Sequence, residues 1–179
     1  MKIVMLSFFI LASLTIIACS NQAGSLLEKE QAERFSLSFV ETYFTKDCDK
    51  FYNSWADYYY IIDDKVAGSK YDMDKEDYCR LVNRFVDEGY TFNDYLSLYE
   101  PKLLEKSEYT IPPYSLELEK IENSGFIPEA RDYLFIGSEI KINKNYYIIP
   151  KKQFVDTSPL VFFVRKIKEE WKVVAINDY

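Results

Sequence analysis

The fold class is decided by the stretch LVFFVRKIKEEWKVVAI, residues 160–176. Leu160 to Val164 are apolar on both faces of an extended chain, which is the pattern of a central strand. Lys168 to Glu170 predict a turn, and Trp171 to Ile176 predict the last strand because they are rich in β-branched residues. This stretch therefore predicts two neighbouring strands of a sheet.

Strand patterns also precede this stretch, from Pro113 onward. Ser115 to Lys120 alternate between polar and apolar residues, as in a half-buried strand. Arg131 to Ile142 predict one long strand or a bent pair, with Gly137 as a bulge. Tyr146 to Ile149 follow a turn and predict a further strand. The later part of the chain is therefore expected to form an antiparallel meander.

A long helix is predicted between Ser25 and Asp47. Ser25 and Glu28 match a capping box, in which two side chains satisfy each other's free amides at a helix start. The apolar residues that follow at helical spacing are Ala32, Phe35, Phe39 and Tyr43. Neighbouring apolar residues widen this face, so the helix is expected to lie in the hollow of a curved sheet.

Shorter elements are predicted between this helix and the later strands. Aromatic and β-branched residues from Asp57 to Gly68 suit an extended segment that turns at Asp63-Asp64. Asp74 is placed to cap a second helix, and Thr91 to Tyr99 predict a short third one. The residues that follow, up to Pro113, are expected to be mainly loop.

Helices first and an antiparallel meander last indicate an α+β fold, with N-terminal helices packed on a bent C-terminal antiparallel sheet. The order resembles the cone-shaped superfamily that includes nuclear transport factor two, the SnoaL-like polyketide cyclases and the scytalone dehydratases. Ala32 to Asp47, as the opening helix, and Glu170 to Ile176, as the closing strand, carry the resemblance. It implies a cone-like domain of a kind that hosts both enzymes and binding modules. The pocket His–Asp pair of many such enzymes is impossible here, because the chain has no histidine.

The N-terminus has the parts of a bacterial export signal. Lys2 precedes an apolar run from Ile3 to Ala18, and the tetrad Ile16-Ile17-Ala18-Cys19 resembles the lipobox of bacterial lipoproteins. In that family, signal peptidase II cuts before a cysteine that already carries diacylglycerol. A plain transmembrane helix is the first alternative, although the run is shorter than the roughly 20 residues that span a bilayer core. The second alternative is a cleaved signal that leaves Cys19 as an ordinary thiol.

The lipobox resemblance implies a lipoprotein signal peptide over residues 1–18 and a lipidated Cys19 with a flexible tether over residues 19–25. The helix and strand pattern predicts one α+β domain over residues 26–179. Acyl chains on Cys19, palmitate among them, anchor a protein to a membrane surface without spanning it. The implied location is the cell envelope. Ser20 favours the outer membrane on its periplasmic side if the cell is Gram-negative, because enteric bacteria use Asp at this position for inner-membrane retention.

Cys48 and Cys79 are the remaining cysteines, and an even pair in an exported protein predicts a disulfide. Closing a loop of about 30 residues stabilises a fold by roughly 3–4 kcal/mol in the chain-entropy model. The alternative is two buried thiols that act as small apolar residues.

Composition excludes several function classes. The chain has a net charge of −7 and no histidine, the commonest general base and metal ligand. No basic patch predicts nucleic-acid binding, and the five glycines form no phosphate-binding loop or nucleophile elbow. We therefore assign no catalytic residue, metal or cofactor.

An aromatic cluster offers a candidate ligand site. Tyr52, Trp55, Tyr58 and Tyr60 are the candidate binding residues, since aromatic rings can line a ligand-accepting mouth. The alternative is that alternate members of this cluster face the core and the others lie at its margin.

These observations predict a membrane-anchored envelope lipoprotein with a non-enzymatic domain that binds a small ligand or an envelope protein. One alternative is an enzyme of the cone superfamily that uses carboxylates or tyrosines as acid and base. Another is an immunity-type inhibitor, for which an acidic face would suit a basic target.

Overall fold

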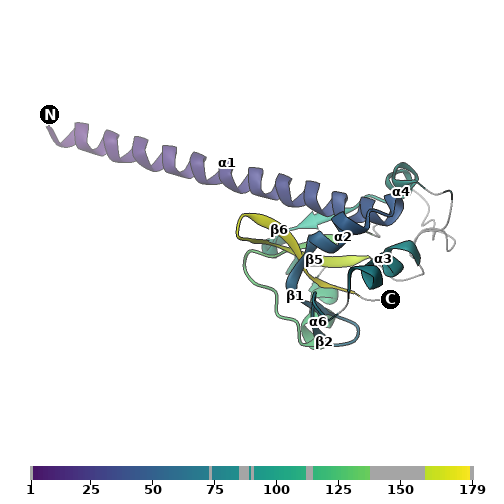
Figure 1. Cartoon of the computed structure of the whole chain (residues 1–179). Helices are drawn as coiled ribbons and strands as arrows, with labels where there is room; N and C mark the ends of the chain where they lie inside the picture. The colour runs from purple at the N-terminus through teal and green to yellow at the C-terminus, as the bar shows by residue number, and fades with distance from the viewer. Residues whose placement is uncertain are drawn as a thin grey trace, which may run out of the picture. The chain divides into compact units, whose positions relative to one another are not determined.

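Helices form most of the first part of the chain and strands form its end, an α+β arrangement (Figure 1). The structure is a computed structural model, and it describes residues 2–72, 74–84, 89, 91–111, 115–137 and 160–177. The chain divides into two units, Met1–Gln31 and Ala32–Tyr179.

The first helix, α1 (Lys2–Thr45), is uninterrupted, so the helix start predicted at Ser25 is wrong. Because the helix already runs through the preceding residues, the amides near Ser25 have partners one turn earlier and need no cap. The predicted end is confirmed, because Lys46 adopts a left-handed conformation with φ of 56° directly after the helix. Among the residues whose side chains are described, no helix is long and apolar enough to cross a membrane.

In the part of the chain that the structure describes, three short helices lie between Thr45 and Lys102. α2 (Cys48–Ser54) is capped by Asp47, whose carboxylate accepts from the Lys50 amide at 3.0 Å. The predicted helices are confirmed as α3 (Lys75–Arg84) and α4 (Phe92–Leu98). Asp74 caps the first of these and Thr91 caps the second.

Six strands form one mixed sheet in the order β2-β1-β6-β5-β4-β3. The strands are β1 (Trp55–Ile61), β2 (Val66–Ser69), β3 (Lys102–Leu104), β4 (Tyr133–Ile136), β5 (Val161–Ile167) and β6 (Glu170–Ile176). All neighbours are antiparallel except β1 and β6, which are parallel. The expected C-terminal antiparallel meander is thus corrected to a mixed sheet, because the hairpin of β1 and β2 joins it along the free edge of β6.

The strands predicted from residues 160–176 are confirmed as β5 and β6, and β5 lies in the interior of the sheet. The predicted turn between them is formed by Lys168 and Glu169, with φ of 49° and 68°. Two left-handed residues in a two-residue hairpin loop are the geometry of a type I′ turn, which normally selects Asn-Gly. This turn therefore carries backbone strain.

Replacing Glu169 with glycine is expected to raise the free energy of unfolding by about 1 kcal/mol, because glycine adopts this conformation without a steric penalty. Chemical denaturation followed by fluorescence measures the change. The matched control is Lys166→Gly, which removes the same exposed Lys166–Glu169 ion pair from an extended position. Glycine within a strand is destabilising, so the control should lose stability. An equal loss of unfolding free energy in both variants would show that the turn is unstrained.

Two segments differ from the sequence prediction. Ser115 to Lys120 lie in helix α6 (Ser115–Ser124) rather than in a strand, and the buried Leu118 and Ile121 show the helical three-residue spacing. The expected loop before Pro113 contains β3 and the short helix α5 (Lys106–Tyr109).

The predicted strand over Arg131–Ile142 is confirmed over β4 only. Gly137 follows β4 instead of forming a bulge within it, and its amide donates to the Leu160 carbonyl at 2.7 Å. Residues 138–142 and the predicted strand Tyr146–Ile149 lie outside the described residues.

Both faces of the sheet are buried, which explains why β5 is apolar throughout. On one face, Phe162 packs with Phe39 of α1 and with residues of α2, α3 and α4. On the other face, Phe163 packs with Tyr109 of α5, Phe126 and the buried residues of α6. Helices therefore cover the sheet on two sides.

Candidate functional site

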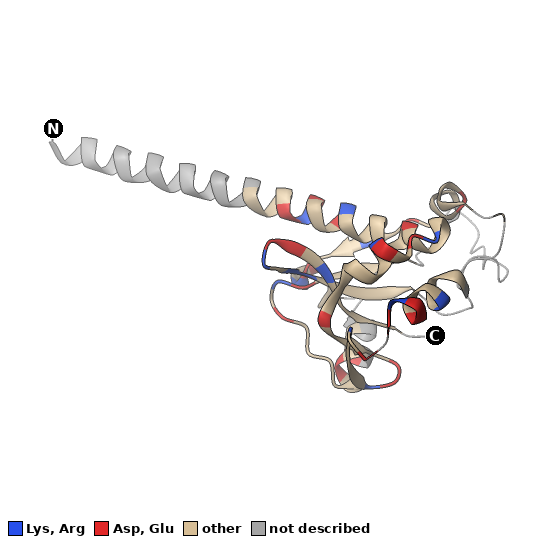
Figure 2. Cartoon of the chain, in the orientation of Figure 1, with Lys and Arg blue, Asp and Glu red and all other residues tan. Residues whose placement is uncertain are grey.

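A groove of about 520 Å³ lies where β1, the residue after β2, and the β5–β6 hairpin meet. Its wall includes Trp55 to Tyr58 of β1 and the three lysines Lys70, Lys168 and Lys172. Glu170 completes its charged residues. We call this the lysine groove. Figure 2 shows charges of both signs at the turn between β5 and β6.

An irregular pairing of β1 with β6 shapes this groove. Trp55 lies opposite Val173 and Tyr60 opposite Ala175, so β1 advances five residues while β6 advances two. The residues between the two pairs form a bulge. Asp57 and Tyr58 on this bulge are exposed, and Tyr58 is 78% exposed. The bulge therefore turns residues of an inner strand toward the groove.

Lys70 is the least exposed charged residue of the groove, at 9%. Its ammonium lies 4.2 Å from the centre of the Tyr52 ring, a cation–π contact. Burial lowers the pKa of Lys70, and the neighbouring charge of Lys172 lowers it further, while Asp57 and Glu170 oppose the shift. Within the described residues the Lys70 ammonium forms no hydrogen bond or ion pair, although Asp57 and Glu170 act on it electrostatically.

Lys172 is held by two acceptors. Its ammonium donates to the Asn53 carbonyl at 2.8 Å and pairs with the Glu170 carboxylate at 2.8 Å. This pairing lowers the pKa of the Glu170 carboxyl. The Glu170 carboxylate therefore already has Lys172 as its cationic partner.

Two exposed tyrosines border the groove. Tyr71 is 68% exposed, and its hydroxyl donates to the Asp57 carboxylate at 3.0 Å. This hydrogen bond, followed by the charge of Asp57, raises the pKa of Tyr71. Asp57 is thus engaged with Tyr71, and the ring of Tyr58 stays open to solvent.

The structure brings three of the four predicted aromatic residues to this region. Trp55 and Tyr58 line the groove, and Tyr52 reaches it through the contact with Lys70. Tyr60 packs instead against the opposite face of the sheet, where its hydroxyl donates to the Ser124 carbonyl at 2.9 Å. Tyr59 is buried in the core on the face opposite Tyr60, beside the exposed Tyr58, so the burial along β1 does not alternate strictly.

Sequence reasoning missed Lys70 and Lys172, the two groove residues with the most distinctive surroundings. They belong to distant segments and match no local motif, so only the parallel pairing of β1 with β6 places them together. The one sequence signal for this region was the run of aromatic residues beginning at Tyr52.

Cys48 at the start of α2 and Cys79 in α3 are free thiols that lie together. A hydrogen bond to Cys48 raises the pKa of the Cys79 thiol to about 11. Nearby, the rings of Tyr52 in α2 and Tyr78 in α3 pack edge to face with their centres 5.1 Å apart, so the two helices are in contact here. The two sulfur atoms are therefore neighbours, and the disulfide between them stays a prediction.

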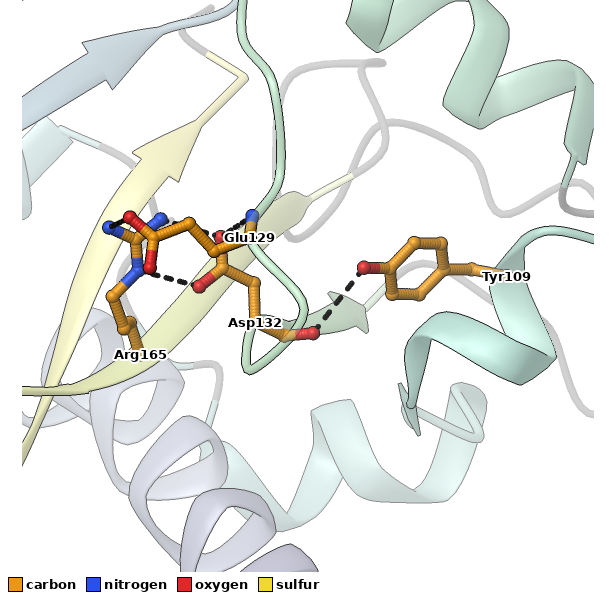
Figure 3. A network of polar contacts seen from close by, with 4 residues as sticks. All are labelled: Tyr109, Glu129, Asp132 and Arg165. Carbon is orange, nitrogen blue, oxygen red and sulfur yellow. Dashed lines mark hydrogen bonds and ion pairs between the residues drawn. The ribbon is translucent and has the colours of Figure 1, made fainter.

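A second polar cluster, drawn in Figure 3, has a structural role. Arg165 of β5 donates to both carboxylate oxygens of Asp132, at 2.6 and 2.8 Å, and to Glu129 at 2.5 Å. The Glu129 amide also donates to Asp132, and the hydrogen bond to Asp132 raises the pKa of Arg165. Tyr109 donates to the Asp132 carbonyl at 3.5 Å. The Asp132 carboxylate is fully engaged and offers no free atom to a substrate.

No three His, Cys, Asp or Glu side chains gather to hold a metal ion in the part of the chain that the structure describes. Comparison with protein-family models, curated proteins and solved structures gives no match. The lysine groove is therefore the candidate site on its geometry alone.

Proposed function

We propose that this chain is a lipid-anchored protein of the bacterial cell envelope, and that its α+β domain binds a ligand or partner protein in the lysine groove without catalysing a reaction. The observation that supports binding is Lys70, a residue that is 9% exposed and whose ammonium forms no ion pair or hydrogen bond among the described residues. The lipobox tetrad ending at Cys19 supports the anchor. The outer membrane is the proposed location if the cell is Gram-negative.

An acid–base enzyme of the cone superfamily is the second candidate, and Asp57 with Tyr71 is its most suitable pair at the groove. Their hydrogen bond raises the pKa of Tyr71 instead of lowering it. A tyrosine that acts as a base near neutral pH needs a lowered pKa. The raised pKa of Tyr71 therefore does not favour this tyrosine as the base of such an enzyme.

The oxidation state of the Cys48–Cys79 pair depends on the proposed compartment. Exported proteins meet an oxidising environment outside the cytosol, where neighbouring thiols form disulfides. We propose that this pair is oxidised in the mature protein and joins α2 to α3.

The anchor is tested by replacing Cys19 with serine in the full-length protein. We expect the unaltered chain to lose residues 1–18, to carry acyl chains on Cys19 and to sediment with membranes, because these chains give stable anchoring. The Cys19→Ser variant should lose the lipid mass and the processing. Intact-mass spectrometry with membrane fractionation measures both, and alkylation in the same spectra reports the other two thiols.

The matched control for this test is the double variant Cys48→Ser/Cys79→Ser, which should keep the lipid. An unaltered chain that retains residues 1–18 and carries no acyl group would contradict the anchor.

A further inference from the structure

We infer that the lysine groove binds a sugar that carries a phosphate or carboxylate, with the anionic group between the ammonium groups of Lys70 and Lys172 and the sugar ring on Tyr58. This inference rests on the proposed binding function and names its ligand class. Four observations carry it: the balance of charges, the identity of the unpaired groups, the fixed position of Lys70 and the exposed aromatic ring.

The groove has an excess of positive charge. Its charged residues are three lysines and two carboxylates, although the whole chain has a net charge of −7. Lys168 lies exposed at the turn beside the other two lysines and forms no ion pair within the described ranges. A positive site on an acidic protein attracts anions locally.

The unpaired polar groups of the groove are hydrogen-bond donors. Both carboxylates are engaged, Asp57 with Tyr71 and Glu170 with Lys172. The Lys70 ammonium, by contrast, has no hydrogen-bond acceptor among the described residues. Lys172 has two acceptors, and an ammonium has three N–H groups, so one more is available. A ligand that satisfies these groups must supply acceptor oxygens.

Lys70 is positioned before any ligand arrives. Its stem is buried and its ammonium lies against the Tyr52 ring, which itself packs on Tyr78. A side chain that is already ordered loses little conformational entropy on binding. An anion beside Lys70 would also offset the repulsion between Lys70 and Lys172, which acts in the structure without a ligand.

The exposed ring of Tyr58 indicates the chemistry of the part of the ligand beside the anionic group. This ring is 78% exposed and belongs to the same groove wall as the lysines. Aromatic faces at a binding site pack against the flat apolar face of a ligand. A ligand with an anionic group next to a ring that has both polar edges and C–H faces fits this wall, and an acidic sugar has that chemistry.

Titration calorimetry of the full-length protein in neutral detergent tests the inference. The probes are glucose 6-phosphate, glucuronate, inorganic phosphate and uncharged glucose. We expect one of the two acidic sugars to bind, glucose to bind at least tenfold more weakly, and affinity to fall with added salt. The preferred acidic sugar decides between phosphate and carboxylate.

Two variants separate the roles of the wall residues. Lys70→Met keeps an unbranched stem on Tyr52 but removes the charge. It should lower the affinity for the acidic sugar about 10- to 100-fold, the range for a charge-assisted hydrogen bond. Tyr58→Ser should lower the affinity for the acidic sugar and leave the affinity for inorganic phosphate unchanged. Lys106→Met, at an exposed position of α5, is the matched control and should bind the acidic sugar as the unaltered chain does.

Absence of binding by both acidic sugars, or equal binding by the unaltered chain and by a folded Lys70→Met variant, would overturn this inference. Circular dichroism establishes that each variant is folded. If the unaltered chain binds neither acidic sugar but crosslinks to one envelope protein, and Lys70→Met lowers this crosslinking, the proposed binding function stands and the ligand class named here is wrong. If the Cys19→Ser variant stays at the membrane while acidic sugars still bind, the anchor fails and the groove assignment stands.

Discussion

Replacing Phe39 with alanine is expected to lower the free energy of unfolding by about 3–5 kcal/mol, the range for removing a buried phenylalanine. Phe39 is fully buried on α1. Its ring stacks on Phe51 at 5.3 Å and meets Trp55 and Phe162 edge to face at 5.9 and 5.1 Å. One side chain thus joins α1, α2 and the two strands β1 and β5. Urea unfolding followed by tryptophan fluorescence measures the loss.

The matched control is Phe35→Ala, one turn earlier on the same helix. Phe35 is only partly buried against the same cluster. A surface-proximal substitution of this kind should cost about 1 kcal/mol. Equal losses at Phe35 and Phe39 would contradict the view that the aromatic cluster around Phe39 is what holds α1 to the sheet.

Replacing Arg165 with methionine is expected to cost about 3–5 kcal/mol, because it leaves the charge of Asp132 without its cation. The Asp132 side chain is fully buried, whereas that of Arg165 is 23% exposed. Methionine keeps most of the apolar stem of Arg165, so the loss reports mainly the charge and its three hydrogen bonds, two to Asp132 and one to Glu129. Equilibrium denaturation of both proteins under the same conditions gives the difference.

A double-mutant cycle separates the pair from its surroundings. The double variant Arg165→Met/Asp132→Leu removes both charges, and apolar pairs often replace buried ion pairs at little cost. We therefore expect it to lose at least about 1 kcal/mol less than the sum of the two single variants. Additive losses would mean that Arg165 and Asp132 do not depend on each other.

Strands β5 and β6 could be predicted from the sequence because their signal is local. An apolar run followed by a charged turn and a second run determines both strands and the turn between them. The cap at Asp74 was equally predictable, since a capping side chain contacts amides within the next turn.

Helix α6 could not be predicted because its sequence fits two periods at once. Leu116 and Leu118 alternate as in a strand, whereas Leu118 and Ile121 are spaced as on a helix. The buried surface beside Phe126 and β4 selects the helical spacing, and that surface is formed by residues distant in the sequence. Tertiary packing here overrides the local pattern.

Only some residues of the lysine groove could be predicted from the sequence. A run of aromatic residues identified Trp55 and Tyr58, but surface lysines have no periodicity that marks them out. Lys70 and Lys172 become neighbours because β1 lies beside β6. The mixed order of the sheet, which the helix-then-strand pattern did not predict, is thus what assembles the candidate site.

The parallel pairing of β1 with β6 has a consequence for biogenesis. During synthesis β1 and β2 emerge long before β6, and until then the inner edge of their hairpin has no strand to pair with. Contacts between distant segments form late and slow the folding of a chain. The edge of β1 that pairs with β6 therefore stays unpaired while the polypeptide is being made, and the sheet closes only after its last strand has been synthesised.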